Sequence, residues 1–214
     1  MRIVCISDTH SKHDHIVVPT GDVLIHAGDL TVEGKIWEID HAFAWLSQQP
    51  HARIIAIPGN HDWGLQLNDW LPQTLKAQFP RVELLIDQES VVEGLRVWGS
   101  PWSPFFNNWA FNFSGGRLGI KEAQRKWDQI PDDTAILITH GPPYGMLDKN
   151  LSGEYAGDSV LKSRIAHLRR LRLHVFGHVH ESYGTVKTAD VTYVNACCCD
   201  RDYRPTQQPI VVDL

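Results

Sequence analysis

Residues 3–10 read Ile-Val-Cys-Ile-Ser-Asp-Thr-His, an apolar run that ends in an acid and a histidine two residues apart. Four more apolar runs end in residues that can bind metal: Gly28-Asp29, Gly59-Asn60-His61-Asp62, His140 and Gly177-His178-Val179-His180. Short runs rich in β-branched residues are typical of buried strands. Polar groups so far apart in the chain could converge only if these runs are strands of one sheet, whose carboxyl ends share an edge.

Helical patterns alternate with these strands. We expect the five strands at Ile3–Ile6, Val23–His26, Ile54–Ile57, Ala135–Ile138 and His174–Phe176, and helices at Glu33–Gln49, Asp69–Phe79, Leu118–Ile130 and Ser159–Leu171. Six further runs stand in two groups without helices between them, and we interpret them as antiparallel strands: Val82–Ile86, Ser90–Val92, Leu95–Trp98, Tyr183–Lys187, Val191–Val194 and Ile210–Asp213. The sequence therefore predicts an α/β fold with a mixed sheet, in one domain over residues 1–214.

The composition is that of an ordinary globular protein, with 43% hydrophobic and 21% charged residues among 214. The net charge of -5 argues against a surface that binds nucleic-acid polymers. No apolar stretch approaches the roughly 20 residues needed to span a bilayer, and the first strand begins at residue 2. We therefore expect a cytoplasmic protein without a membrane partner, and we predict no particular oligomeric state.

Three of the four cysteines, Cys197, Cys198 and Cys199, are contiguous. Neighbouring cysteines rarely have the geometry for an unstrained disulfide, and the spacing makes no disulfide framework. Three thiolates in a row could bind a soft metal. We interpret them instead as small buried residues near the end of a strand.

Each polar cluster also has a structural interpretation when it is taken alone. Asp29 could cap the helix that follows it, and His140 could be a buried histidine with satisfied hydrogen bonds. Asp8 and His10 would point to the same side of a continuing strand, as would His178 and His180, so each pair could reach one ion. A structural explanation of all five clusters would need five coincidences, so we expect a metal centre.

In their order along the chain, the clusters resemble the motifs of calcineurin-like metallophosphoesterases, D-x-H, G-D, G-N-H-D, H and G-H-x-H. The resemblance spans residues 8–180, with no departure at a ligand position. Further stretches are similar to a small subfamily of metallophosphoesterase-domain-containing proteins: Ser7–Ser11, Asp22–Asp29, Ser100–Trp102, Trp109–Phe111, Thr139–Pro143 and Asn195-Ala196. The resemblance implies a sandwich of two mixed sheets flanked by helices. It also implies phosphodiesterase activity, with cyclic nucleotides among the substrates.

The resemblance also implies a role for each site residue. One metal would be held by Asp8, His10 and His180, and the other by Asn60, His140 and His178. Asp29 would bridge both ions, whereas His61 would bind no metal and would face the substrate.

Two divalent ions about 3.5–4 Å apart can share a hydroxide that attacks phosphorus. His61 could protonate the leaving oxygen, and Asp62 could orient its imidazole. Imidazole and oxygen ligands without thiolate suit manganese, iron, zinc, cobalt or nickel. Manganese is the first choice, because cytoplasmic relatives of this kind often work with it.

Two long loops, 100–116 and 141–157, are candidates for substrate contacts. Trp102 could stack on a base, Asn107 could bind its polar edge, and Tyr144 is the candidate in the second loop. These aromatic side chains could instead only cover a sheet. We therefore expect a dinuclear phosphodiesterase acting on small phosphoesters or nucleotides. The alternatives are a phosphomonoesterase, including a protein phosphatase, and a low-activity nucleotide-binding regulatory protein.

Overall fold

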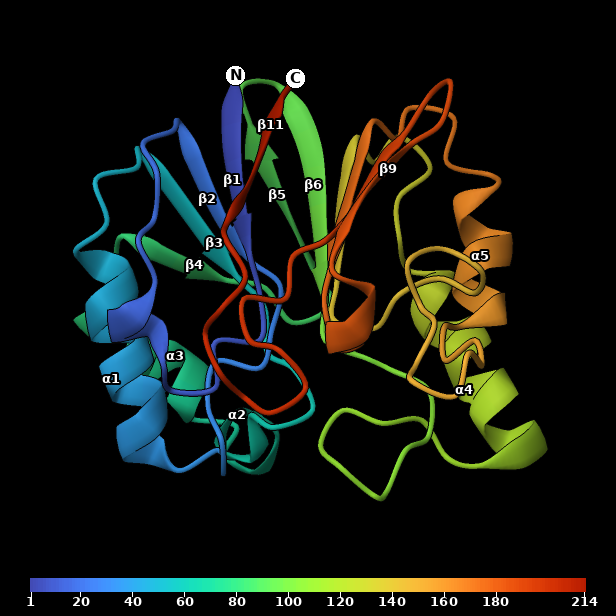
Figure 1. Ribbon diagram of the computed structural model, residues 1–214, viewed down its shortest axis with the longest axis horizontal. Coiled ribbons are helices and arrows are strands. Elements are labelled where there is room, and N and C mark those ends of the chain that lie inside the picture. The colour runs from blue at the N-terminus through green and yellow to red at the C-terminus, as the bar shows by residue number, and fades with distance from the viewer.

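The apolar runs before the predicted ligands are strands in a computed structural model that describes all 214 residues. They are β1 (Arg2–Ile6), β2 (Val23–His26), β3 (Arg53–Ala56), β7 (Ile136–Thr139) and β8 (Leu173–Phe176). The expectation that all five share one sheet is wrong, because β1, β2 and β3 belong to one sheet and β7 and β8 to another. The two sheets pack face to face with helices on both outer sides (Figure 1). This arrangement confirms the predicted α/β sandwich.

The first sheet has the order β11-β1-β2-β3-β4, with β4 at Val82–Leu84 and β11 at Ile210–Asp213. Strands β1 to β4 are parallel to one another, and only β11 is antiparallel, to β1. The antiparallel direction expected for β4 is therefore wrong. Helices α2 and α3 lie between β3 and β4, so the chain crosses over and returns in the same direction.

The second sheet has the order β5-β6-β7-β8-β10-β9. Its remaining strands are β5 (Gln88–Val92), β6 (Leu95–Ser100), β9 (Gly184–Lys187) and β10 (Thr192–Asn195). Strands β5 and β6 form an antiparallel hairpin, and β9 is antiparallel to β10. β10 is also parallel to β8, since the hairpin with β9 turns it back into the direction of β8. Both sheets are mixed, as predicted.

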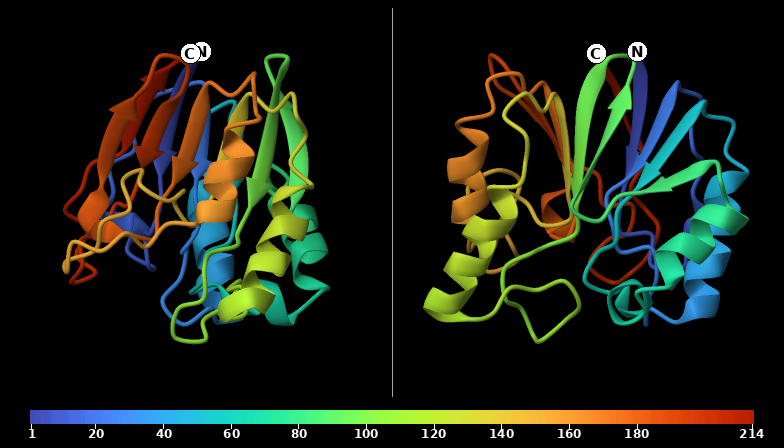
Figure 2. Two further views of the ribbon diagram at one scale, coloured as in Figure 1. Left: turned by 90° about the vertical axis from the view of Figure 1, so that its right-hand side faces the viewer. Right: turned by 180° about the vertical axis from the view of Figure 1, so that it is seen from behind.

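Helices α1 (Ile36–Ser47) and α3 (Leu71–Gln78) cover the first sheet, and α4 (Gly116–Trp127) and α5 (Ser159–Ile165) cover the second (Figures 1 and 2). The short α2 (Trp63–Leu67) lies past the lower ends of the strands in Figure 1. Short 3-10 helices lie at His13–His15 and His180–Ser182. On α1 the side chains of Ile39, Phe43 and Leu46 are fully buried at helical spacing. No helix has the length and apolar character needed to cross a membrane.

The five strands that precede the predicted ligands are buried on both faces. Ile3 and Cys5 of β1 point into a core between the sheets, where they join Ile136 and Val175 of the second sheet. The intervening residues of β1, Val4 and Ile6, point instead to the helices. This double burial explains the continuous apolar runs in the sequence. The same packing holds the carboxyl ends of these strands, from both sheets, at one edge of the molecule.

Candidate metal centre

The predicted ligands leave their strands through unusual backbone conformations. Asp8, His10, Asp29 and His178 have positive φ angles of 52°, 41°, 55° and 70°. Left-handed backbone at non-glycine residues costs on the order of 1–3 kcal/mol each and is concentrated at functional sites. β1 ends at Ile6, so Asp8 and His10 converge through these turns. The expectation that a continuing strand brings the two side chains together is wrong.

Glycines beside the ligands allow the segments to approach closely. A Cβ atom on Gly28 would lie 2.6 Å from Nδ1 of His140, and one on Gly59 would lie 2.8 Å from its Cε1. A Cβ atom on Gly177 would collide with the carboxylate of Asp8. The three glycines therefore leave the space in which the ligand side chains lie.

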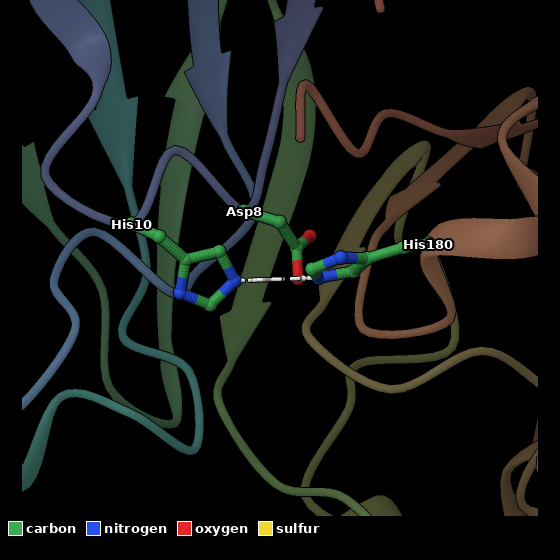
Figure 3. Close-up of side chains that lie close together, drawn as sticks. All are labelled: Asp8, His10 and His180. Atoms are coloured by element: carbon green, nitrogen blue, oxygen red, sulfur yellow. Dashed lines mark hydrogen bonds and ion pairs between the residues drawn. The ribbon is translucent and has the colours of Figure 1, made fainter. Parts of the chain in front are cut away.

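Asp8, His10 and His180 form one group, which we call the first subsite (Figure 3). Nε2 of His180 lies 3.1 Å from Oδ1 of Asp8 and 3.3 Å from Nε2 of His10. Asp8 and His10 are fully buried, and His180 is partly buried. Two segments far apart in the sequence thus direct three ligand atoms to one point.

Asn60, His140 and His178 form the second subsite. Oδ1 of Asn60 lies 2.8 Å from Nε2 of His140 and 2.6 Å from Nδ1 of His178. Oδ2 of Asp29 lies between the subsites, 3.4 Å from Nε2 of His140 and 3.8 Å from Nε2 of His10. The seven side chains predicted as ligands are therefore brought together in two groups joined by one carboxylate.

The outer hydrogen bonds of three imidazoles direct their lone pairs inwards. The Nδ1–H groups of His10, His140 and His180 donate to the carbonyls of Thr31, Ala27 and Asp200, over 3.2, 3.0 and 2.9 Å. When the imidazole is neutral, its Nε2 atom therefore presents a lone pair to the centre, as is usual for histidines that bind metal. Lone pairs that face one another and carboxylate oxygens repel unless protons or metal ions lie between them. The donor set thus fits two divalent ions bound by nitrogen and oxygen.

The pKa values of the side chains at the centre also show that it favours positive charge. Burial raises the pKa of Asp8, but the hydrogen bond and charge of His180 outweigh it and hold the pKa well below its usual range. Burial lowers the pKa of His140 and His180, yet the neighbouring carboxylates outweigh it and raise both to about 9. Burial lowers the pKa of His10 and His178 to about 4. Without metal, protons on two imidazoles would balance the two carboxylates, and bound ions would displace them.

His61 lies beside the centre, and residues outside the two subsites fix its imidazole. Its Nδ1–H donates to the carbonyl of Val32 over 2.7 Å, which leaves Nε2 free. Its ring stacks on Trp109, with centroids 4.3 Å apart and planes inclined by 27°. Its backbone N–H donates to Oδ1 of Asp29 over 2.8 Å, the oxygen that does not face the imidazoles. The free Nε2 can carry a proton for a substrate.

Asp62 does not orient this imidazole, contrary to expectation. Its carboxylate accepts hydrogen bonds from the N–H groups of Gly59, Leu30 and Thr31 and from the Thr31 hydroxyl, over 2.6–3.2 Å. The contact expected from Asp62 is made by the Val32 carbonyl. Asp62 therefore fastens the loop that carries Asn60 and His61 to the loop that carries Asp29.

The three residues predicted to contact substrate have different surroundings, and their contact with substrate stays a prediction. The indole N–H of Trp102 donates to Asp87 over 2.9 Å, and its ring stacks on Phe113. Asn107 is exposed in the same loop. Tyr144 is exposed and packs against Tyr155. Trp102 thus lies in the packing under α4, and the interpretation that it covers a sheet fits its contacts.

Other aromatic residues surround the metal centre. Besides Trp109, the ring of Phe106 lies 6.3 Å from that of His178. The ring of Tyr203 lies 4.6 Å from that of His10 and 5.6 Å from that of His180. Phe106 and Trp109 belong to the loop 100–116, which we call the aromatic loop because it contains six aromatic residues, and this composition was the signal for them. Tyr203 follows no motif and could not be found from the sequence.

This fold and this donor set are those of a known family. The chain belongs to the calcineurin-like phosphoesterases, because the model of that family matches residues 1–182. It is 39% identical over 237 residues to Metallophosphoesterase domain-containing protein 1 of Homo sapiens, covering 100% of this chain and 71% of that protein. A UPF0046 protein of Caenorhabditis elegans is 32% identical over 232 residues, covering 100% of this chain and 81% of the relative. The sequence resemblance to metallophosphoesterases is confirmed.

Solved structures support the fold. The crystal structure of TT1561 from Thermus thermophilus superposes with a TM-score of 0.64 at 14% identity, over 91% of this chain and 88% of that one. At this level of identity the similarity concerns the fold alone. Family membership is consistent with metal-dependent hydrolysis of phosphoesters, and divalent metals are bound in this family.

Proposed function

We propose that this protein is a dinuclear-metal-dependent phosphodiesterase that hydrolyses small phosphate esters, with cyclic nucleotides as candidate substrates. One observation carries the proposal: two groups of inward lone pairs lie side by side, and Oδ2 of Asp29 stands between them. A single metal would use only one of the two groups. The shared carboxylate supports a pair of ions.

The residues of each subsite have defined tasks in this proposal. Asp8, His10 and His180 would hold one ion, Asn60, His140 and His178 would hold the other, and Asp29 would contact both. When bound, two divalent ions would activate a water molecule and neutralise the phosphate oxygens. Asn60 is a neutral ligand, so two carboxylates face two ions and the centre keeps positive charge for an anionic substrate. Manganese is our first choice of metal, with iron, zinc, cobalt and nickel as alternatives.

His61 would protonate the leaving oxygen. The Val32 carbonyl fixes the proton on Nδ1, so Nε2 is the atom that can receive and donate a second proton. Stacking on Trp109 limits the rotation of the imidazole. A phosphodiester of an ordinary alcohol, such as a cyclic nucleotide, has a poor leaving group, for which this proton is needed.

The alternatives share the same ligands. A phosphomonoesterase, including a protein phosphatase, would use the same two subsites and differs only in the ester. A low-activity nucleotide-binding regulatory protein would tolerate the loss of a ligand or of His61, and all eight are in place. The net charge of -5 disfavours a nucleic-acid polymer as substrate. Four free, buried cysteines fit the proposed cytoplasmic location.

The test is a phosphoester panel on metal-stripped protein. Bis- and mono-nitrophenyl phosphate and 2′,3′- and 3′,5′-cyclic nucleotides are assayed after addition of each of the five metals, with Asp29→Ala as the inactive control. We expect the diesters to be hydrolysed faster than the monoester, with two ions bound per chain. Faster hydrolysis of the monoester would establish the phosphomonoesterase instead. Tight nucleotide binding without turnover would establish the regulatory protein.

A further inference from the structure

The triple cysteine has a place at the metal centre. We propose that Cys197 is a positioning residue for the first subsite, and that the segment 197–203 braces this subsite and not the second. The inference rests on the proposed dinuclear function, because it concerns one of two ions. It assigns a role to a motif that the ligand pattern leaves unexplained.

All three ligands of the first subsite contact this one segment. The thiol of Cys197 donates to Oδ2 of Asp8 over 3.1 Å. The carbonyl of Asp200 accepts the Nδ1–H of His180 over 2.9 Å. The ring of Tyr203 meets the ring of His10 edge to face at 4.6 Å. A short stretch of chain thus holds an aspartate and two histidines from outside.

The second subsite is supported by other parts of the molecule. The Nδ1–H of His140 donates to the carbonyl of Ala27, and Asn60 interacts with the two histidines of its own group. The hydrogen bonds and ring contacts of the segment 197–203 reach none of Asn60, His140 and His178. Disturbing the segment should therefore affect one ion and spare the other.

Cys197 fixes which oxygen of Asp8 faces the subsite. Oδ2 accepts the thiol, and the backbone N–H of His178 lies 3.1 Å from each of the two oxygens. Oδ1 is then left to face His180. Without the thiol, less would oppose rotation of the carboxylate about its side-chain bond. Hydrogen bonds of this kind set the orientation of a metal-binding side chain.

The segment also lies where the two sheets are joined. Cys197 forms a parallel bridge with Ser7, and the N–H of Cys198 donates to the Ser7 carbonyl over 2.8 Å. These contacts link the chain after β10 to the chain after β1. Cys197 is fully buried, so its thiol contacts groups inside the molecule and not solvent.

Cys198 provides a matched control. It is also fully buried, but its thiol faces the carbonyl of Ala196 within its own segment, at 3.6 Å. Cys197→Ala and Cys198→Ala therefore remove the same atom from adjacent buried positions. Only the first removes a contact to a ligand. Cys197→Ser keeps a donor at the same position.

The experiment is a Mn²⁺ titration of the metal-stripped protein, followed by equilibrium dialysis and electron paramagnetic resonance. We expect two ions per wild-type chain with a spin-coupled signal. In Cys197→Ala one of the two binding steps should lose roughly 10–100-fold in affinity and the other should be unchanged, so that one uncoupled Mn²⁺ remains at low metal. Cys197→Ser should lose less, and Cys198→Ala should resemble wild type.

Each other outcome is informative. Equal affinities in Cys197→Ala and wild type would overturn the positioning role and leave the dinuclear proposal intact. An equal loss in Cys198→Ala would show a general packing effect, which also overturns it. If the wild type binds at most one Mn²⁺, the dinuclear proposal itself fails for this metal, and the role of Cys197 fails with it.

Discussion

The replacement of His61 by alanine tests the division of labour at the centre. His61 lies close enough to His10 and Asp29 for the three to be considered as a metal-binding group. Its Nδ1 is engaged with the Val32 carbonyl and its ring with Trp109, so we assign Nε2 to the substrate. His61→Ala should therefore retain both metals and lose the proton donor.

The size of the loss follows from this role. A positioned general acid contributes about 10²–10⁴ in rate, or roughly 3–5 kcal/mol of activation free energy. A cyclic nucleotide has an alkoxide leaving group, and its kcat should fall by the full factor. A nitrophenolate leaves without a proton, so hydrolysis of bis-nitrophenyl phosphate should fall less. The difference between the two substrates isolates proton donation from any other effect.

The assay combines kcat for both substrates with metal content by plasma mass spectrometry. His167→Ala, at an exposed histidine of another surface, controls for the loss of an imidazole. Asp29→Ala shows how much metal is lost when a shared ligand is removed. If His61→Ala loses as much metal as Asp29→Ala, His61 is a ligand and the assignment is refuted. Equal losses of rate with both substrates would refute proton donation.

Four further results are expected. Asp62→Ala leaves three backbone N–H groups without their acceptor and should lower the free energy of unfolding by about 3 kcal/mol or more in urea, whereas a loss below about 1 kcal/mol would contradict the fastening role. Trp102→Ala should lower Tm and change KM equally for nucleotide and nitrophenyl diesters, while Trp109→Ala should lower kcat by loosening His61. A larger change of KM for nucleotide diesters than for nitrophenyl diesters in Trp102→Ala would show that Trp102 contacts the substrate. Metal removal should lower Tm, because an ion at 100 times its Kd contributes about 2.7 kcal/mol, or roughly 5–10 °C for a chain of this size; an unchanged Tm would argue against a resident metal.

The strands and the ligand order could be predicted from the sequence because both depend on local patterns. A strand buried on both faces needs an unbroken apolar run, and β1 and β2 provide it. The division of these strands between two sheets depends on contacts between distant residues. Only the family resemblance indicated it. The direction of β4 was predictable in principle, since the helix predicted before it creates a crossover.

The partners of side chains at the centre were less predictable. Asp62 follows His61 directly, but the turn directs its carboxylate to the N–H groups of the neighbouring loop. The group that orients His61 is the backbone carbonyl of Val32. Every residue has such a carbonyl, so the residue type at this position does not reveal its role. In the aromatic loop, Trp102 and Trp109 look alike in sequence. Only the tertiary structure assigns one to the core and the other to the site.

The left-handed backbone at the centre shows how strain and chemistry are connected. Asp8, His10, Asp29 and His178 would each adopt their conformations at less cost as glycine, and each would then lose its ligand atom. The strain, on the order of 1–3 kcal/mol per residue, persists because the surroundings leave no alternative. Fully buried strands end just before these residues, and close glycines hold the segments together. The packing of the rigid sandwich thus compensates the free energy needed to bring the ligand side chains together. Bound cations would then relieve the repulsion among the lone pairs that face one another.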